Sequence, residues 1–338
     1  MSNKNILVLD IGGTNFRIGL FSPNSHSLSN VKRFPTPNFI EYPKNSVSEI
    51  QKLLVDTIVT NINTYIEEYK DNIECIGISF AGPIDKQGGV RGAPTIWGKE
   101  GDILQLGEII SERVKKETGV INDITAAAWK YSDDYDKPFC VITVSSGIGN
   151  KVFYKNEVLI NDEGFGGEIG HYRCELNDDS IICDCGGIGH LGAISSGRGV
   201  LELAKRTGRQ QPELYKQSLL NTLSNGNIDS LTNKEVVYAI HKNDEFAIKI
   251  LKKSHYYLAD AMSCIYNAIG VDNFIIIGGF AIAVGKQYID FLTEQLKIIG
   301  CFGKKENDIE KMIRLGESND DHCLIGAGIY MLKRKVNG

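Results

Sequence analysis

The sequence lacks the features of a membrane or secreted protein. No apolar run among its 338 residues is long enough to span a bilayer, and the polar start MSNKN contains no apolar signal core. No internal repeat and no long proline- or serine-rich linker interrupts the chain. These absences predict a cytoplasmic globular protein, and the length is sufficient for two domains.

An excess of charge of one sign is also missing. The net charge is -5, with 37 Lys and Arg residues against 42 Asp and Glu residues, which gives no electrostatic reason to expect a nucleic acid or an anionic membrane as partner. Close cysteine pairs are rare: of eight cysteines, only Cys183 and Cys185 are near neighbours. Without a secretory signal, we expect reduced thiols or metal ligands rather than a disulfide framework.

Strand-like and helix-like segments alternate along the chain, which predicts an α/β fold. The capping-box pattern Ser46-x-x-Glu49 precedes isoleucine and leucine at four-residue spacing, and predicts a long helix ending near residue 70. A boundary near residue 122 is expected to divide the chain into two α/β halves. The other expected elements are strands over residues 5–9, 17–21, 73–79, 139–145 and 274–277, and helices over 251–269 and 324–335.

Three glycine loops follow predicted strands. The first, DIGGTN from Asp10, lies between two strands, which argues against a Rossmann motif because that motif needs a helix N-terminus for the pyrophosphate. Such a hairpin offers backbone N–H groups and the Thr14 hydroxyl to phosphate oxygens. Asp10 is a candidate Mg²⁺ ligand, directly or through water. A plain hairpin turn is the alternative.

The second loop, SSGIG at residues 145–149, and the third, Gly278-Gly279, also follow strands. Together the loops predict a nucleotide in an interdomain cleft, because one nucleotide needs contacts from both sides. The predicted nucleotide-binding residues are Asp10, Gly12, Gly13, Thr14, Asn15, Ser146, Gly147, Gly149, Gly278 and Gly279.

Two further segments carry candidate chemistry. Cys183 and Cys185, with His171 and His190 on either side, fit a tetrahedral Zn²⁺ site. The alternative is a pair of buried thiols with surface histidines. The polar pair Asn122-Asp123 lies where an apolar stretch meets a helix, a junction that faces the cleft in open α/β sheets. Asp123 is therefore a candidate general base, with a helix cap as the alternative. The predicted zinc ligands are His171, Cys183, Cys185 and His190.

These motifs resemble the ROK family of bacterial sugar kinases and repressors, within the sugar kinase/actin/Hsp70 superfamily. DIGGTN, the second glycine loop and IIGG at 276–279 resemble the phosphate and adenosine motifs, and GEIGH with CDCGGIGH resembles the zinc segment. The resemblance covers nearly the whole chain. It implies a two-lobed ribonuclease H-like or actin-like fold with mixed five-stranded sheets. The small lobe is residues 1–122 with a returning helix at about 323–338, and the large lobe is 123–322 with the zinc loop and dimerisation helices.

The resemblance also implies an activity. It is ATP-dependent phosphorylation of a hydroxyl of a hexose or hexose-like substrate, with Mg²⁺, structural Zn²⁺ and a homodimer. Asp123 matches the family's general base, with Glu168 as fallback. Asn122, Glu168 and His171 match residues that bind sugar hydroxyl groups, His171 while also binding zinc.

The chain departs from the family pattern at four places. His190 replaces the last cysteine, which still suits zinc, so Cys174 is a less favoured ligand. Gly192 replaces a sugar-binding glutamate, and Thr95 replaces an asparagine with a longer reach. Lys151 stands in place of a glycine after the second loop and is expected to be solvated rather than bound to phosphate.

Four functions therefore stay open from the sequence. The first is a kinase of a hexose or amino-hexose, and the second is a kinase of a cyclitol or modified sugar, which the changes at Gly192 and Thr95 favour. The third is a sugar-sensing repressor, against which the first motif begins at Asp10 and leaves no room for a helix-turn-helix. The fourth is a non-catalytic actin-like assembly protein, against which the zinc segment and Asp123 argue.

Overall fold

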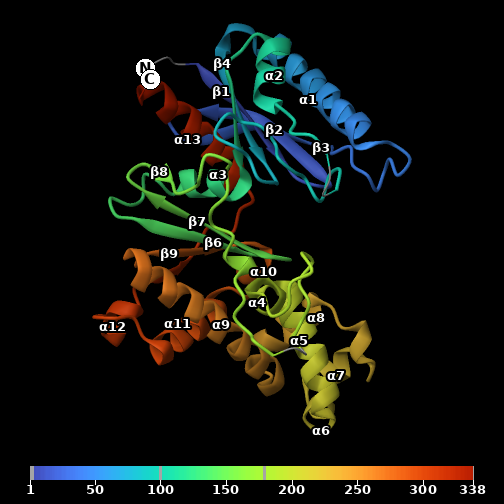
Figure 1. Cartoon of the computed structure of the whole chain (residues 1–338), viewed down its shortest axis with the longest axis vertical. Helices are drawn as coiled ribbons and strands as arrows, with labels where there is room; N and C mark the ends of the chain where they lie inside the picture. The colour runs from blue at the N-terminus through green and yellow to red at the C-terminus, as the bar shows by residue number, and fades with distance from the viewer. Residues whose placement is uncertain (1–3, 99–100, 178–179, 338) are drawn as a thin grey trace. The chain divides into compact units, whose positions relative to one another are not determined.

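The computed structural model describes residues 4–98, 101–177 and 180–337 and contains two five-stranded sheets (Figure 1). The first sheet has the order β3-β2-β1-β4-β5, and the second has the order β10-β9-β6-β7-β8. The first sheet comprises β1 (Asn5–Ile11), β2 (Asn15–Ser22), β3 (Ser27–Pro35), β4 (Ile73–Phe80) and β5 (Thr118–Asn122). The second comprises β6 (Phe139–Val144), β7 (Ile148–Tyr154), β8 (Glu157–Val158), β9 (Phe274–Ile277) and β10 (Ile313–Leu315).

Both sheets are mixed, as expected. The hairpin β1–β2 is antiparallel while β1–β4 and β4–β5 are parallel. The hairpin β6–β7 is antiparallel while β6–β9 and β9–β10 are parallel. The expected strands are therefore confirmed. The sequence did not predict β3, whose mostly exposed, polar residues lack an apolar pattern.

Helices fill most of the remaining chain. The capping box of α1 is confirmed, because the Ser46 hydroxyl accepts from the Glu49 N–H and the Glu49 carboxylate accepts from the Ser46 N–H. Gly270 ends α9 in the left-handed conformation, with φ of 73°. The helices are α1 (Val47–Tyr69), α2 (Leu106–Val114), α3 (Asp123–Lys130), α4 (Leu191–Ser195), α5 (Gly197–Gln210), α6 (Pro212–Lys216), α7 (Leu219–Leu223), α8 (Asn233–His241), α9 (Glu245–Ile269), α10 (Gly279–Val284), α11 (Lys286–Ile299), α12 (Glu306–Ile309) and α13 (His322–Asn337).

The chain forms two compact units, each with its own apolar core. The division falls after Asp136, whereas the sequence places it near residue 122, because α3 packs against α13 within the first unit. Gly338, the last residue of the expected returning helix, lies outside the described residues. Unit 1 comprises Met1–Asp136, Asn156–Gly166 and Asn319–Gly338, and unit 2 comprises Lys137–Lys155 and Gly167–Ser318.

Helices cover both faces of the first sheet. In Figure 1, α1 and α2 lie on one face, and α13 lies on the other. Glycines allow α13 to approach closely. A Cβ added at Gly77 of β4 would lie 2.6 Å from the carbonyl oxygen of Ala327, and one at Gly326 would lie 1.7 Å from that of Ala126 in α3. The sheet, α3 and α13 therefore form one tightly packed body.

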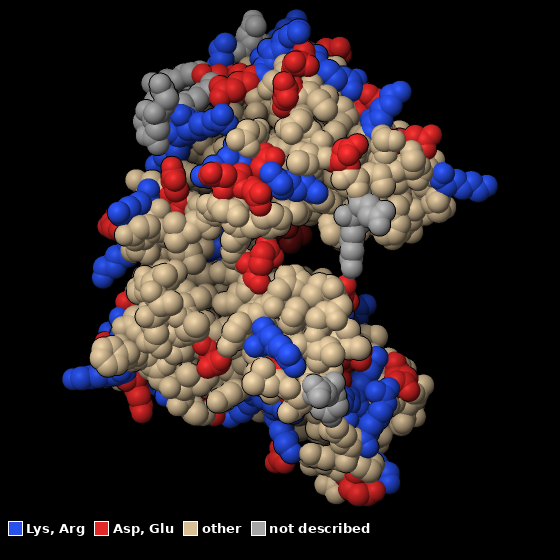
Figure 2. Space-filling model, in the orientation of Figure 1, with Lys and Arg blue, Asp and Glu red and all other residues tan. Residues whose placement is uncertain are grey.

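The surface carries charges of both signs. Figure 2 shows Lys and Arg residues interspersed with Asp and Glu residues over the visible face, in keeping with the small net charge. The described helices include none with the length and apolar character that a bilayer crossing requires.

Candidate active site

The first glycine loop is the turn of the β1–β2 hairpin in unit 1. The N–H of Gly12 donates to the carbonyl oxygen of Asn15 at 3.1 Å, and the Asn38 amide holds the Gly13 carbonyl at 3.2 Å. A Cβ added at Gly13 would lie 2.6 Å from the Cβ of Thr95, so only glycine fits beside that side chain. Thr14, Asn15 and Thr95 are exposed. The loop is thus a fixed turn with its hydroxyl and amide groups available to a ligand.

Asp10 lies one residue before the end of β1, between partners on both neighbouring strands. The Arg17 guanidinium on β2 donates to Oδ2 at 2.9 Å, and the Ser79 hydroxyl on β4 donates to Oδ1 at 3.1 Å. A carboxylate has about four lone-pair sites, so both oxygens still accept a further partner. The carboxylate therefore has room for a water molecule that binds Mg²⁺ while the Arg17 and Ser79 contacts are kept.

Asn122 and Asp123 lie where β5 meets α3, also in unit 1. Asn122 is the N-cap, because its side-chain oxygen accepts from the N–H groups of Ile124 and Thr125 at 3.0 and 3.1 Å. Its amide donates to Asp123 Oδ1 at 2.7 Å, and the Ile124 N–H donates to the same oxygen at 2.9 Å. The N-cap of α3 is thus Asn122 and not Asp123. Asp123 is a partly buried carboxylate in a fixed orientation.

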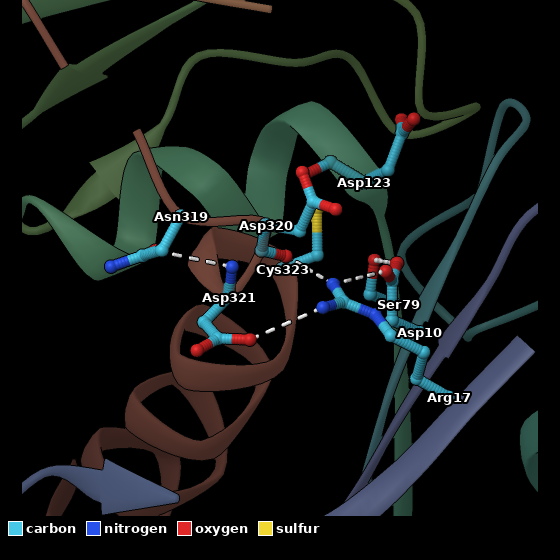
Figure 3. A network of polar contacts seen from close by, with 8 residues as sticks. All are labelled: Asp10, Arg17, Ser79, Asp123, Asn319, Asp320, Asp321 and Cys323. Carbon is cyan, nitrogen blue, oxygen red and sulfur yellow. Dashed lines mark hydrogen bonds and ion pairs between the residues drawn. The ribbon is translucent and has the colours of Figure 1, made fainter. Parts of the chain in front are cut away.

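Cys323, which the sequence did not single out, lies beside both aspartates. Its thiol is 3.5 Å from the carbonyl oxygen of Asp123 (Figure 3). Burial, and then the charges of Asp10 and Asp123, raise the pKa of this thiol well above its ordinary value. It is therefore a neutral, weakly polar neighbour of the two carboxylates. No local motif marks it, because helix α13 brings it there from far along the chain.

In unit 2, the second and third glycine loops lie together. The Ser145 N–H donates to the carbonyl oxygen of Gly147 at 3.0 Å, which closes the second loop. The Ser145 carbonyl oxygen accepts from the N–H of Gly197 at 2.8 Å. Gly278 has φ of 100°, and its added Cβ would lie 2.6 Å from the carbonyl oxygen of Val144. The backbones of the two loops are thus in contact at the ends of β6 and β9. Ser146 is exposed and Gly149 is buried within β7.

The segment around Glu168 is docked onto β7. The Asn150 side chain accepts from the Ile169 N–H at 3.2 Å, and an added Cβ on Gly170 would lie 2.1 Å from the Ile148 carbonyl oxygen. Lys151 is only 2% exposed, and its ammonium lies 3.9 Å from the Glu168 carboxylate. The expectation that Lys151 is solvated was therefore wrong, because the Glu168 segment covers its side chain.

The four predicted zinc ligands form one cluster in unit 2. One ligand atom from each of these residues lies within 4.8 Å of the other three. Cys185 Sγ is 3.2 Å from His190 Nδ1, and Cys183 Sγ is 3.8 Å from His171 Nδ1. Tetrahedral Zn²⁺ with bonds of about 2.0–2.3 Å needs ligand atoms at about these separations. The residues therefore fit the ion.

Glycines shape the turn that holds this cluster. The Cys183 N–H donates to the Gly187 carbonyl at 2.8 Å, and an added Cβ at Gly187 would lie 2.2 Å from the His190 ring. Cys174 is not among the clustered residues, and its thiol instead lies 3.6 Å from the Gly189 carbonyl oxygen. Gly192, at the start of α4, lies against Gly170, with its added Cβ 3.1 Å from that carbonyl oxygen.

Comparison with known proteins gives a consistent picture. The model of the ROK family matches residues 6–334. A C(7)-cyclitol 7-kinase of Streptomyces hygroscopicus is 37% identical over 324 residues, which cover 96% of this chain and 92% of that protein. A glucokinase of Halalkalibacterium halodurans is 25% identical over 344 residues, which cover 100% of this chain and 97% of that protein.

A solved structure shares the fold. The ROK family glucokinase from Streptomyces griseus, in complex with glucose and AMPPNP, superposes with a TM-score of 0.71 at 22% identity, covering 96% of this chain and 98% of that one. The expected fold class, with two mixed five-stranded sheets, is thus confirmed.

Proposed function

The chain belongs to the ROK family, and on that premise we propose that it is an ATP-dependent kinase whose acceptor is a C7-cyclitol. The relatives described above are kinases of a cyclitol and of glucose, so phosphoryl transfer to a polyol hydroxyl is common to both. The observation that favours the cyclitol is the 37% identity to a C(7)-cyclitol 7-kinase along 96% of the chain. A hexose acceptor is the second candidate.

Two residues support this choice. By the motif resemblance described above, Gly192 and Thr95 correspond to a glutamate and an asparagine of the family's hexose kinases, so fewer side chains would be available to discriminate ring hydroxyl groups. A seven-carbon cyclitol has one carbon outside its six-membered ring. Its hydroxyl is therefore a primary alcohol, like the exocyclic hydroxyl of a hexose, and we propose this group as the acceptor.

Asp123 is the proposed general base. Asn122 and the N–H of Ile124 fix one carboxylate oxygen, so the group is oriented before the acceptor arrives. Asp123 takes the proton of the acceptor hydroxyl as its oxygen bonds to the γ-phosphorus. The bond from that phosphorus to the bridging oxygen of ADP breaks. Asn122, Glu168, His171 and Thr95 are the proposed hydroxyl-binding residues.

The glycine loops are the proposed phosphate and nucleotide contacts. Thr14 and the backbone of the first loop would hold phosphate oxygens, and Asp10 would hold Mg²⁺ through water. The metal supplies neutralisation of the phosphate charge when it is bound. The ligand cluster in unit 2 is a proposed structural Zn²⁺ site, with His171 bound through Nδ1. The homodimer and the cytoplasmic location stay predictions.

The acceptor is tested with the purified protein and a coupled assay of ADP release. Glucose, mannose, glucosamine and a C7-cyclitol are compared at matched concentrations. We expect kcat/KM for the cyclitol to exceed that for glucose by at least about tenfold, which corresponds to about 1.4 kcal/mol of transition-state binding. Phosphorus NMR of the product then locates the phosphate. Strong turnover of glucose without cyclitol activity would contradict the proposed acceptor.

The base is tested with Asp123→Ala. Loss of a general base lowers kcat by roughly 10²- to 10⁴-fold, and we expect ADP binding, measured by calorimetry, to stay unchanged. An Asp123→Ala protein with wild-type turnover would show that another group, Glu168 first, removes the proton.

A further inference from the structure

Arg17 connects Asp10 to a distant part of the chain. It is paired directly with Asp10 across the β1–β2 hairpin, and Ser79 is the partner of Asp10 on β4. The guanidinium is only 12% exposed, and its Nη2 lies 2.9 Å from Asp10 Oδ2. Asp10 therefore has a donor on each neighbouring strand, and its carboxylate has little freedom to rotate.

The other side of Arg17 is held by the turn that precedes α13 (Figure 3). Its Nη1 lies 3.1 Å from Asp321 Oδ1, and its Nη2 also donates to the carbonyl oxygen of Asp320. The Asn319 side chain accepts from the Asp321 N–H at 3.2 Å, which shapes this turn. Arg17 thus bridges the end of β1 and the start of the last helix.

The charges explain why an arginine suits this place. Burial opposes the charged form of Arg17, but the hydrogen bond and the charges of Asp10 and Asp321 raise its pKa above the ordinary value. A planar guanidinium binds two carboxylates through different nitrogens, which a lysine ammonium does not reproduce. Because the single positive charge of Arg17 faces both Asp10 and Asp321, it only partly neutralises the negative charge of Asp10.

We propose that Arg17 is a positioning residue for the magnesium–nucleotide complex, acting through Asp10 and anchored by the turn before α13. The role rests on the proposed function, in which Asp10 holds Mg²⁺ through water. Groups that orient a metal-binding side chain typically contribute 10- to 100-fold to metal affinity. On this proposal, residues 320 and 321, in the turn before α13, take part in nucleotide binding.

The test is calorimetric binding of ADP at a series of Mg²⁺ concentrations, which requires neither acceptor nor turnover. Arg17→Met removes the positive charge and both contacts, and we expect the Mg²⁺ concentration for half-maximal ADP binding to rise roughly tenfold. Arg17→Lys keeps the charge, and we expect its Mg²⁺ concentration for half-maximal ADP binding to rise less. For Asp321→Asn we expect that concentration to rise about two- to fivefold, because the Asp10 and Asp320 contacts remain.

The design separates positioning from simple charge. If Arg17 acted only as a nearby cation, its removal would lower the Mg²⁺ requirement, since a repulsive charge is lost. A lowered or unchanged requirement in Arg17→Met would therefore overturn the proposal. Arg113→Met, which removes the exposed pair with Asp56, is the matched control and is expected to behave like the wild type. If Arg17→Met does not fold, Arg17→Lys and Asp321→Asn decide by the same criterion.

The same measurement tests the proposed function independently. The wild-type protein is expected to bind ADP in the presence of Mg²⁺. Absence of that binding would overturn both the kinase assignment and the role of Arg17. Normal wild-type binding with an unaltered Mg²⁺ requirement in the variants would overturn the role of Arg17 alone.

Discussion

Lys151 is an uncommon kind of residue, a lysine almost completely removed from solvent. Burying an ammonium group costs several kcal/mol unless an opposite charge and hydrogen-bond partners compensate. Glu168, whose carboxylate lies 3.9 Å away and whose side chain is 55% exposed, supplies the opposite charge. The buried ammonium thus lies within ion-pair distance of a carboxylate that is itself largely open to solvent.

Lys151→Met is expected to raise the KM for the acceptor roughly tenfold, with the KM for ATP unchanged. The physical reason is that Glu168, a proposed hydroxyl-binding residue, loses the positive charge 3.9 Å from its carboxylate. Steady-state kinetics with both substrates varied measures the two constants. Lys253→Met, on the exposed surface of α9, is the control. Equal increases in both KM values would instead indicate a general disturbance of unit 2.

At the scale of elements, the contact between α9 and α11 contains two buried polar rings. His255 of α9 and Tyr288 of α11 are both fully buried, and their ring centroids are 4.3 Å apart at an angle of 71°. Within the described part of the chain, the two imidazole nitrogens of His255 and the hydroxyl of Tyr288 have no hydrogen-bond partner. Burial lowers the pKa of His255 to about 3 and raises that of Tyr288.

His255 is expected to make unit 2 less stable in acid. Between pH 6.5 and about 3 the unfolded chain binds a proton that the folded chain does not, so stability falls as pH falls, by up to about 1.4 kcal/mol per pH unit. His255→Leu removes this dependence. Urea unfolding at pH 7.5 and 5.5 measures it, and Tyr288→Phe, which keeps the imidazole, is expected to retain it. The prediction would be contradicted if the free energy of unfolding fell equally between pH 7.5 and pH 5.5 in the wild type and in His255→Leu.

The elements that sequence reasoning predicted well are those with local signals. Strand β1, the capping box at Ser46 and the cap at Gly270 are each specified by residues within a few positions. Burial of Lys151 was missed because it depends on a segment 17 residues later along the chain, beginning at Glu168. Arg17 was missed because its partner, Asp321, is 304 positions away.

The candidate site follows the same division. The four candidate zinc ligands were grouped correctly because two thiols and two imidazoles lie within 20 residues, and the structure brings all four together. The roles of Asp123 and Glu168 stay predictions, because a carboxylate becomes a base or a ligand only through the acceptor beside it. Cys323 could not be found from its neighbours in sequence, since packing of α13 alone places it near Asp10 and Asp123.

At the scale of the whole molecule, the two units have separate cores. The core of unit 1 is built from β1, β2, β4, α1 and α2, and that of unit 2 from β6, β9 and helices between α4 and α11. The proposed zinc site belongs to unit 2, in a segment rich in glycine and poor in regular structure. A metal there would replace the secondary structure that this segment lacks.

Removal of zinc is therefore expected to loosen unit 2 and to leave unit 1 intact. The purified protein is expected to contain about one zinc ion per chain by elemental analysis. After chelation, hydrogen exchange of residues 171–190 is expected to accelerate by at least about tenfold, with β1 and β4 unchanged. Cys183→Ser is expected to reproduce the effect and Cys174→Ser to have none. Wild-type exchange in metal-free Cys183→Ser protein would argue that the cluster is only a group of thiols and imidazoles.

The return of α13 to unit 1 has a consequence for synthesis of the chain. A ribosome produces all strands of the first sheet, then the whole of unit 2, and only afterwards the helix that covers the open face of that sheet. The unit made first is thus completed last. Because Arg17 meets Asp321 only when α13 docks, a nascent chain cannot arrange Asp10 as the finished protein does until translation has passed the start of that helix.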